Sequence, residues 1–306
     1  MASIKRAFKY LLHNRNQFYD SLVKNLFSFL PDKIYLSLRY RFIMRRKINW
    51  EYPRYFTEKI QVLKLINRNP LYTIMVDKYA AKQYVSDIFG LECIIPTLGV
   101  WDSPDEIDWA KLPNQFVLKT THGGGGGGIV ICHNKEQLDK AKAKEKLNLS
   151  LKSDIYKEFR EWPYKNVPRK VIAEQYMAST DIESTKDLTD YKFYCFNGEP
   201  KYCQVIRDRN TCETIDFYDM RWQHQDFIGL NPNVSNGLKP VPCPKQLSKM
   251  IEMCVVLSKG IPFLRVDLYE INGKVYFGEL TFFPASGYGA FSPSEWDEKL
   301  GHLINI

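Results

Sequence analysis

The chain has no apolar run of the roughly 18–20 residues that a membrane-spanning helix requires, so we predict no such helix. It has no recognisable secretion signal, because the apolar stretch from Ala7 to Leu12 is short and interrupted by charge. The seven cysteines are an odd number and contain no C-x-x-C pair, which argues against a disulfide framework and a zinc ribbon. We therefore expect free thiols and a cytoplasmic protein.

Several catalytic motifs are also missing. The chain contains no G-x-S-x-G nucleophile elbow, no convincing Cys–His pair, and no Asp-x-Asp of the kind that many metal-dependent glycosyltransferases carry. The glycine run at 123–128 is followed by Ile129 and a strand pattern, which excludes a P-loop and a dinucleotide fingerprint, since both open a helix. The 306 residues, 44% hydrophobic and 25% charged, otherwise indicate an ordinary globular protein of about two domains.

The net charge of +8 is concentrated in the first 50 residues, which hold 11 Lys/Arg against Asp20 and Asp32. Apolar residues in this segment recur at helical spacing, and a basic amphipathic helix suits an anionic membrane surface. We expect peripheral membrane contact through residues 1–47, at the inner face of the cytoplasmic membrane. The alternative is that these helices pack on the body and expose a basic face. We expect no nucleic acid partner, because no nucleic-acid-binding motif accompanies the charge.

The pattern of the remaining chain predicts helices mixed with antiparallel hairpins, hence an α+β fold. Helical spacing or propensity covers 1–48 with a break near Pro31, 56–89 with a pause at Asn69-Pro70, 134–150 and 247–257. Strands are expected at 93–100, on both sides of the glycines within 116–132, and at 171–173. Two hairpins are expected, one over 191–206 about Asn197-Gly198 and one over 263–282 about Asn272-Gly273.

The glycine segment is the first candidate site. Gly123, Gly124, Gly125, Gly126, Gly127 and Gly128 lie between two predicted strands, with Lys119 near the end of the first. A backbone without side chains can approach a ligand closely and offer its N–H groups to anionic oxygens. The hairpin is therefore interpreted as a flap over phosphates, and the alternative is a solvent-exposed tip.

Two acids form the second candidate site. Asp267 and Glu279 lie on the two arms of the last predicted hairpin, so strand pairing can bring them together. Adjacent carboxylates repel unless a cation lies between them, and Mg²⁺ with substrate phosphates meets that need. A salt bridge to Arg265, or two solvated acids, is the alternative. The small residues Ser286 and Gly287 that follow are candidates for an acceptor pocket.

In this order, these segments resemble the ATP-grasp superfamily, and more closely its TupA-like branch of bacterial surface-polysaccharide enzymes. The resemblance covers about residues 48–290. It is carried by the segments 56–61 (FTEKIQ), 69–72 (NPLY), 76–79 (VDKY), 116–119 (FVLK), 122–123 (HG), 173–176 (AEQY) and 278–281 (GELT).

The resemblance implies roles for individual residues. Lys78 and Lys119 match lysines placed against nucleotide phosphates, and residues 123–128 match the flap. Glu174, Gln175 and Tyr176 match the strand that contacts adenine, and Asp190 and Lys192 match polar contacts to ribose or phosphate. Asp267 and Glu279 match metal ligands. Arg265, Lys119 and His122 are the expected catalytic residues. The chain departs from the family pattern at Thr281, where many members have an asparagine ligand, so one or two Mg²⁺ ions are expected.

The resemblance also implies an ATP-grasp fold, two α+β subdomains that grip ATP, with an extra helical N-terminal segment. We expect a basic segment at 1–48, an N-terminal lobe at 49–112, a central subdomain at 113–178 and a C-terminal lobe with the metal site at 179–306. The implied reaction is ATP-dependent carboxylate–amine ligation through an acyl phosphate. The implied partners are a small-molecule amine and a uronic-acid-containing nucleotide sugar or polysaccharide. The alternatives are a glycosyltransferase and a kinase-like or non-catalytic nucleotide-binding protein.

Overall fold

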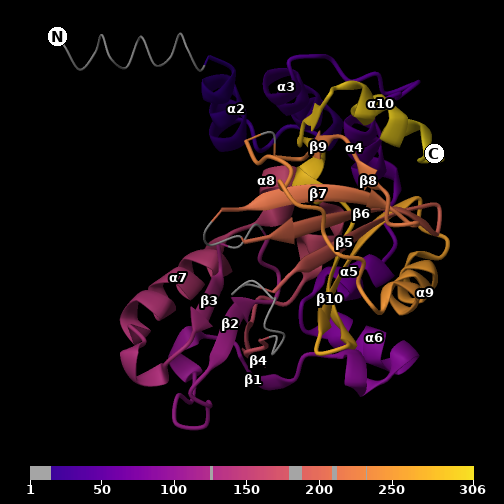
Figure 1. Ribbon diagram of the computed structural model, residues 1–306. Coiled ribbons are helices and arrows are strands. Elements are labelled where there is room, and N and C mark those ends of the chain that lie inside the picture. The colour runs from indigo at the N-terminus through magenta and orange to yellow at the C-terminus, as the bar shows by residue number, and fades with distance from the viewer. Residues whose placement is uncertain (1–14, 125–126, 179–187, 209–211, 232) are drawn as a thin grey trace, which may run out of the picture.

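The computed structural model describes residues 15–124, 127–178, 188–208, 212–231 and 233–306. These residues form two antiparallel sheets with helices packed around them (Figure 1). The α+β class predicted from the sequence is confirmed.

The larger sheet has the strand order β11-β10-β5-β6-β7-β8 and is antiparallel throughout. Its strands are β5 (Asp190–Phe196), β6 (Glu199–Arg207), β7 (Thr214–Asp219), β8 (His224–Gln225), β10 (Phe263–Ile271) and β11 (Lys274–Thr281). Both predicted hairpins are confirmed. Each turn residue, Asn197, Gly198, Asn272 and Gly273, has a positive φ, as the tight turns that match strand twist require.

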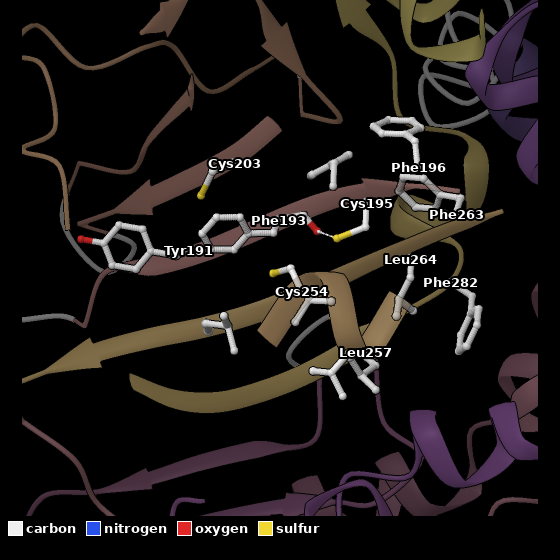
Figure 2. Packing of buried hydrophobic residues seen from close by; sticks show 14 of the residues in the cluster. Tyr191, Phe193, Cys195, Phe196, Cys203, Cys254, Leu257, Phe263, Leu264 and Phe282 are labelled. Atoms are coloured by element: carbon white, nitrogen blue, oxygen red, sulfur yellow. Dashed lines mark hydrogen bonds between the residues drawn. The ribbon is translucent and has the colours of Figure 1, made fainter. Parts of the chain in front are cut away.

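Residues on both faces of this sheet belong to the main hydrophobic core. Helix α9 (Leu247–Ser258), confirmed where the spacing predicted it, places Cys254 and Leu257 against buried residues of β5 and β10 such as Phe193 and Leu264 (Figure 2). Because side chains alternate along a strand, the even-numbered residues of β5, including Lys192, lie on the opposite face. The candidate site occupies that second face.

The smaller sheet has the order β1-β4-β2-β3. Its strands are β1 (Thr97–Trp101), β2 (Phe116–Thr120), β3 (Ile129–Cys132) and β4 (Val171–Gln175), and helix α7 (Lys140–Lys152) packs on it. Leu147 of α7 joins Phe116, Leu118 and Ala173 in a separate core. β1 precedes the expected boundary at 112/113 but pairs with β4, so this sheet draws strands from both of the ranges expected for different subdomains.

The remaining helices surround the two sheets. They are α2 (Arg15–Leu26), α3 (Asp32–Met44), α4 (Phe56–Ile66), α5 (Leu71–Val76), α6 (Ala80–Phe89), α8 (Ile155–Phe159) and α10 (Glu295–His302). The predicted breaks at Pro31 and Asn69-Pro70 are both present. A short pair of strands, β9 (Ile228–Gly229) and β12 (Phe291–Ser292), completes the fold. No described helix is long and apolar enough to cross a membrane.

Helices α2 and α3 are anchored to the body by a buried arginine. Arg39 is 3% exposed, and its Nε and Nη2 atoms donate to the carboxylate of Asp20 at 2.6 and 2.9 Å. Its Nη1 donates to the carbonyl of Glu158 at 2.6 Å, and the Tyr35 hydroxyl donates to the same carbonyl at 2.8 Å. Helices α2 and α3 therefore pack on the body, and one of their basic residues, Arg39, is internal.

Candidate functional site

The two predicted metal-binding acids lie side by side in the larger sheet. Asp267 of β10 is in register with Glu279 of β11 on one side and with Lys192 of β5 on the other. Directly opposed residues of an antiparallel pair project from the same face, so the three side chains form one polar row. Lys192 Nζ is ion-paired with Asp267 and lies 3.7 Å from Asp190 Oδ2.

A β-bulge makes this row compatible with the core. Asp267 pairs with Glu279, but the next residue, Leu268, pairs with Phe277, which leaves Gly278 as the extra residue of β11. The extra residue shifts the alternation, so Glu279 shares the polar face while Phe277 is buried. A Cβ at position 278 would lie 2.9 Å from the Asp267 carbonyl oxygen, which explains the glycine.

Arg265 joins the two acids. Its Nε and Nη2 atoms donate to Asp267 Oδ1 and Oδ2 at 2.7 and 2.8 Å, and Nη2 also lies 3.1 Å from Glu279 Oε1 and 3.0 Å from Thr281 Oγ1. This is the salt bridge that the sequence left as an alternative. Bidentate pairing of this kind fixes both the position and the charge of the carboxylate.

Lys78 connects the row to the smaller sheet. Its Nζ donates to Glu279 Oε2 at 2.6 Å, while its backbone N–H donates to the carbonyl of Thr121, just after β2, at 2.9 Å. Burial alone would raise the pKa of Glu279, but Lys78, Lys192 and Arg265 together hold it well below its usual value. The carboxylate is therefore ionised and surrounded by positive charge.

The face of the smaller sheet opposite α7 carries a second charged group. Glu174 of β4 is 4% exposed and is ion-paired with Lys119 of β2, 2.6 Å away, and with Lys82 of α6. Burial would raise the pKa of Glu174, and the two lysines lower it below the usual value. Lys82 also donates to the Ile95 carbonyl at 2.7 Å. Sequence reasoning missed Lys82, although its position one helical turn after Lys78 could have suggested it.

The donor atoms of Asp267 and Glu279 are of the kind that a divalent cation prefers. Asp267 and Glu279 supply hard carboxylate oxygens from adjacent strands, and the Thr281 hydroxyl lies in the same group. Among the described residues, no cluster of three or more His, Cys, Asp and Glu side chains could hold a metal ion. Two carboxylates with substrate oxygens nevertheless fit Mg²⁺, which is commonly held by one or two carboxylates and phosphates.

A model of the TupA-like ATP-grasp family matches residues 58–305 of this chain. The chain belongs to this family. The match includes the polar row, Lys78, Lys119, Glu174 and the glycine segment, so the resemblance deduced from the sequence is confirmed over the whole candidate site.

Solved structures with a similar fold include D-alanine–D-alanine ligase from Bacillus anthracis, alone (14% identity, TM-score 0.40, 75% of this chain and 59% of that chain) and complexed with ATP (16%, 0.44, 83% and 73%). Another is the ATP-grasp ligase PsnB complexed with minimal precursor (13%, 0.39, 74% and 60%). The chain thus spans about three fifths of two of these structures. Identities and scores this low carry no inference about substrate. A comparison with curated proteins found no match.

The glycine segment of this ATP-grasp chain joins β2 to β3 as predicted, with Gly125 and Gly126 outside the described residues. Gly123 and Gly128 pack so closely on Thr120 and Ser150 that a Cβ would collide, whereas Gly127 has nothing within 4 Å. The end glycines are therefore required for packing against α7, whereas the space around Gly127 is open.

His122 lies beneath this hairpin and not at its surface. The side chain is 2% exposed, and burial together with the charge of Arg169 lowers its pKa. Both ring nitrogens are buried, and neither has a hydrogen-bond partner among the described residues. A catalytic role for His122 therefore stays a prediction, beside the alternative of a structural residue next to the glycine segment.

The other predicted nucleotide contacts are dispersed around Glu174. The Gln175 side chain is exposed, and its backbone N–H donates to the Pro96 carbonyl at 3.0 Å. Tyr176 packs edge-on against His133, with ring centroids 5.0 Å apart. Asp190 is buried beside Lys192 and hydrogen-bonds to Tyr269.

Ser286 and Gly287 lie in the short 3₁₀ segment Pro284–Gly287, which follows β11 and its acids. Ala285, Ser286 and Gly287 have consecutive positive φ values of 46, 52 and 67°, a strained conformation for the first two. It is held from α4: Lys64 Nζ donates to the Ser286 carbonyl at 2.8 Å, and Gln61 Nε2 donates to it at 2.9 Å.

Glu161 is the third member of the buried group that Lys64 and Ser286 form. It accepts a hydrogen bond from Ser286 Oγ at 2.5 Å, and burial raises its pKa. Burial lowers the pKa of Lys64 to about 7, partly offset by the charge of Glu161. Sequence reasoning missed both residues, because nothing local marks them as buried.

Proposed function

We propose that this chain is an ATP-dependent carboxylate–amine ligase that joins an amino acid or amino alcohol to a hexuronic acid in surface-polysaccharide biosynthesis. The observation that supports it best is the polar row of Lys192, Asp267 and Glu279, which Arg265 binds. Lys78 joins this row to the backbone just after β2, the strand that carries Lys119. Adjacent acids bound only by cations suit a ligand that is both metal-bearing and polyanionic.

Nucleotide binding would use both sheets. Lys78, Lys119 and Lys192 can each turn from a carboxylate to a phosphate oxygen, since a lysine is a flexible point charge. The backbone of residues 123–128 would cover the phosphates, and residues 174–176 with Asp190 would contact the nucleoside.

Asp267 and Glu279 would hold Mg²⁺. When bound, the ion would neutralise the negative charge that develops on the phosphoryl oxygens. Arg265 touches both acids, so it orients them and can itself donate to a transferring phosphoryl group.

The proposed reaction has two steps. A carboxylate oxygen of the uronic acid forms a bond to the γ-phosphorus of ATP, the bond from that phosphorus to the β,γ-bridging oxygen breaks, and ADP leaves. The amine nitrogen then bonds to the acyl carbon of the acyl phosphate, the acyl C–O bond breaks, and phosphate leaves as the nitrogen loses a proton. The protein supplies no nucleophile; it positions reactants and stabilises charge. Ser286 and Gly287, just beyond the acids, would line the acceptor pocket.

The uronic acid and the amine come from the family resemblance alone, so the experiment begins with the nucleotide. Thermal unfolding is measured with ATP–Mg²⁺ and with a panel of nucleotide sugars. A ligand at a hundredfold excess over its Kd stabilises the folded state by about 2.7 kcal/mol. ADP release is then followed with mixtures of uronic acids and amines.

Two variants and a matched control identify the site. Glu279→Gln and Lys119→Ala should weaken the ATP–Mg²⁺ stabilisation, and Glu279→Gln should lower turnover by orders of magnitude. Glu199→Gln, an exposed acid at the start of β6, should behave as the wild type. Stabilisation by a nucleotide sugar without any by ATP would refute the ligase proposal and favour glycosyl transfer.

A further inference from the structure

Large apolar side chains are exposed around the turn between α2 and α3. Phe29 is 77% exposed, Leu26 60%, Ile34 50% and Phe27 41%. The rings of Phe27 and Phe29 lie 6.2 Å apart. Apolar groups gathered at one exposed place mark an interaction surface more often than isolated ones do. Leu26, Phe27, Phe29 and Ile34 are called the apolar tip below.

The helices that carry the apolar tip are fixed by their other faces. Val23, Tyr35 and Leu36 form a small buried core, and Arg39 is paired with Asp20 and the Glu158 carbonyl. Arg160 adds an ion pair to Asp32. The exposure of the tip is therefore a consequence of how α2 and α3 pack and not of loose helices.

Four basic side chains of α3 and of the loop that follows it are exposed to solvent. Lys33, Arg41, Arg45 and Lys47 are exposed, and within the described residues none has an acid in salt-bridge distance. By contrast, Arg46 is paired with Asp297. The exposed positive charge is thus what remains after the internal pairs are made.

Two of these lysines share a surface cavity. Lys33 and Lys47 line it with Trp50, and Lys33 Nζ lies 5.6 Å from the centre of the Trp50 ring. An indole beside ammonium groups is a common arrangement at the level of lipid headgroups, where one end of the ring is apolar and the other is wet.

We infer that the apolar tip, with Lys33, Arg41, Arg45 and Lys47, docks this protein on an anionic membrane surface. The exposed charge is predominantly positive, with Glu51 as the acid in the cavity beside Lys33 and Lys47, and it complements phosphate headgroups. The apolar groups stand at a turn, where they can enter the headgroup region without unfolding a helix. A soluble protein partner would need an acidic surface around an apolar pocket, whereas a membrane supplies both in one plane. The inference does not depend on the proposed function.

The test is sedimentation of the full chain with two kinds of vesicle, phosphatidylcholine alone and an equimolar mixture with phosphatidylglycerol. The wild type should bind the mixed vesicles and release them as salt is raised, since surface charge is screened. Two double variants should each lower the partition coefficient at least tenfold: Phe27→Ser/Phe29→Ser and Lys33→Glu/Lys47→Glu. For the lysine variant the reason is that one surface lysine contributes about fivefold.

Matched controls use exposed residues elsewhere. Leu238→Ser removes a fully exposed apolar side chain, and Lys274→Glu reverses a charge at the β10–β11 turn; both should bind as the wild type does. Equal binding to the two vesicle types, no binding at all, or wild-type binding by both double variants would overturn the inference. A chain beginning at Arg15 should still bind; loss of binding there, with the tip variants unaffected, would place the contact in residues 1–14 and refute it.

Discussion

We expect the titration of Lys64 to have a measurable effect on how the free energy of unfolding depends on pH. The side chain is fully buried between α4 and the 284–287 segment, with its Nζ 2.8 Å from the Ser286 carbonyl and 5.0 Å from the centre of the Tyr288 ring. Burial lowers its pKa to about 7 from the ordinary 10.5, with Glu161 opposing the shift. The unfolded chain restores the ordinary value.

The sign of the pH effect follows from these two values. Between pH 7 and 10.5 the unfolded chain binds a proton on Lys64 that the folded chain does not, so the free energy of unfolding rises with pH. One pKa unit corresponds to about 1.4 kcal/mol, so Lys64 contributes a rise of about 2–3 kcal/mol from about pH 7.5 to about pH 9.5. The penalty for burying the charge is largest at and below pH 7.

The assay is urea unfolding at several pH values in that range, for the wild type and for Lys64→Met. Methionine keeps much of the volume and removes the titrating amine, so titrating groups distant from Lys64 cancel in the difference between the two proteins. Glu161 does not cancel, because the charge of Lys64 lowers its pKa in the wild type. The wild type should gain about 1.4 kcal/mol per pH unit relative to the variant. Lys274→Met, at an exposed turn, is the control and should show no such slope. Parallel curves for wild type and Lys64→Met would refute the reasoning.

Three further outcomes are expected. Glu174→Gln should lower the free energy of unfolding, measured in urea, by about 3–5 kcal/mol, because Lys82 and Lys119 lose their shared partner. Lys119→Met should lower it much less, since Glu174 keeps its ion pair with Lys82. Equal losses in the two variants would contradict this prediction. Gly287→Ala should lower the melting temperature more than Gly273→Ala: both have positive φ, but only at Gly287 would a Cβ meet α4 side chains, at 2.6 Å. Mg²⁺ affinity, measured by titration calorimetry, should rise when a non-hydrolysable ATP analogue is present; unchanged affinity would argue against metal binding at Asp267 and Glu279.

The sequence was sufficient to predict the parts of this fold that depend on local chemistry. Asn-Gly pairs set the turns of both hairpins, because few other residues adopt positive φ there. Once the last hairpin is placed, Asp267 and Glu279 must come close, and the structure pairs them directly. The breaks at Pro31 and Pro70 follow from the same kind of local restriction.

What the sequence could not supply are contacts between distant segments. Lys64 meets Ser286 across 222 residues and Lys78 meets Glu279 across 201, and no local pattern encodes either pairing. Strands β8, β9 and β12 are two residues each, too short to have a periodicity. The bulge at Gly278 could not be predicted from the sequence either. The alternation of β11 is regular on either side of it, and the extra residue is evident only from the pairing with β10.

The charge arrangement also explains why metal and nucleotide should bind together. Asp267 and Glu279 are already neutralised by Arg265, Lys78 and Lys192, so a metal ion alone must compete with three cations for the same oxygens. A polyphosphate alone must draw the same cations away from the acids and leave two carboxylates adjacent and uncompensated, which is costly in a partly buried site. A ligand that brings a divalent cation for the acids and anionic oxygens for the cations satisfies both halves at once. If the proposed function holds, these ion pairs would form a stable resting state, and their partners would be exchanged only when both components bind.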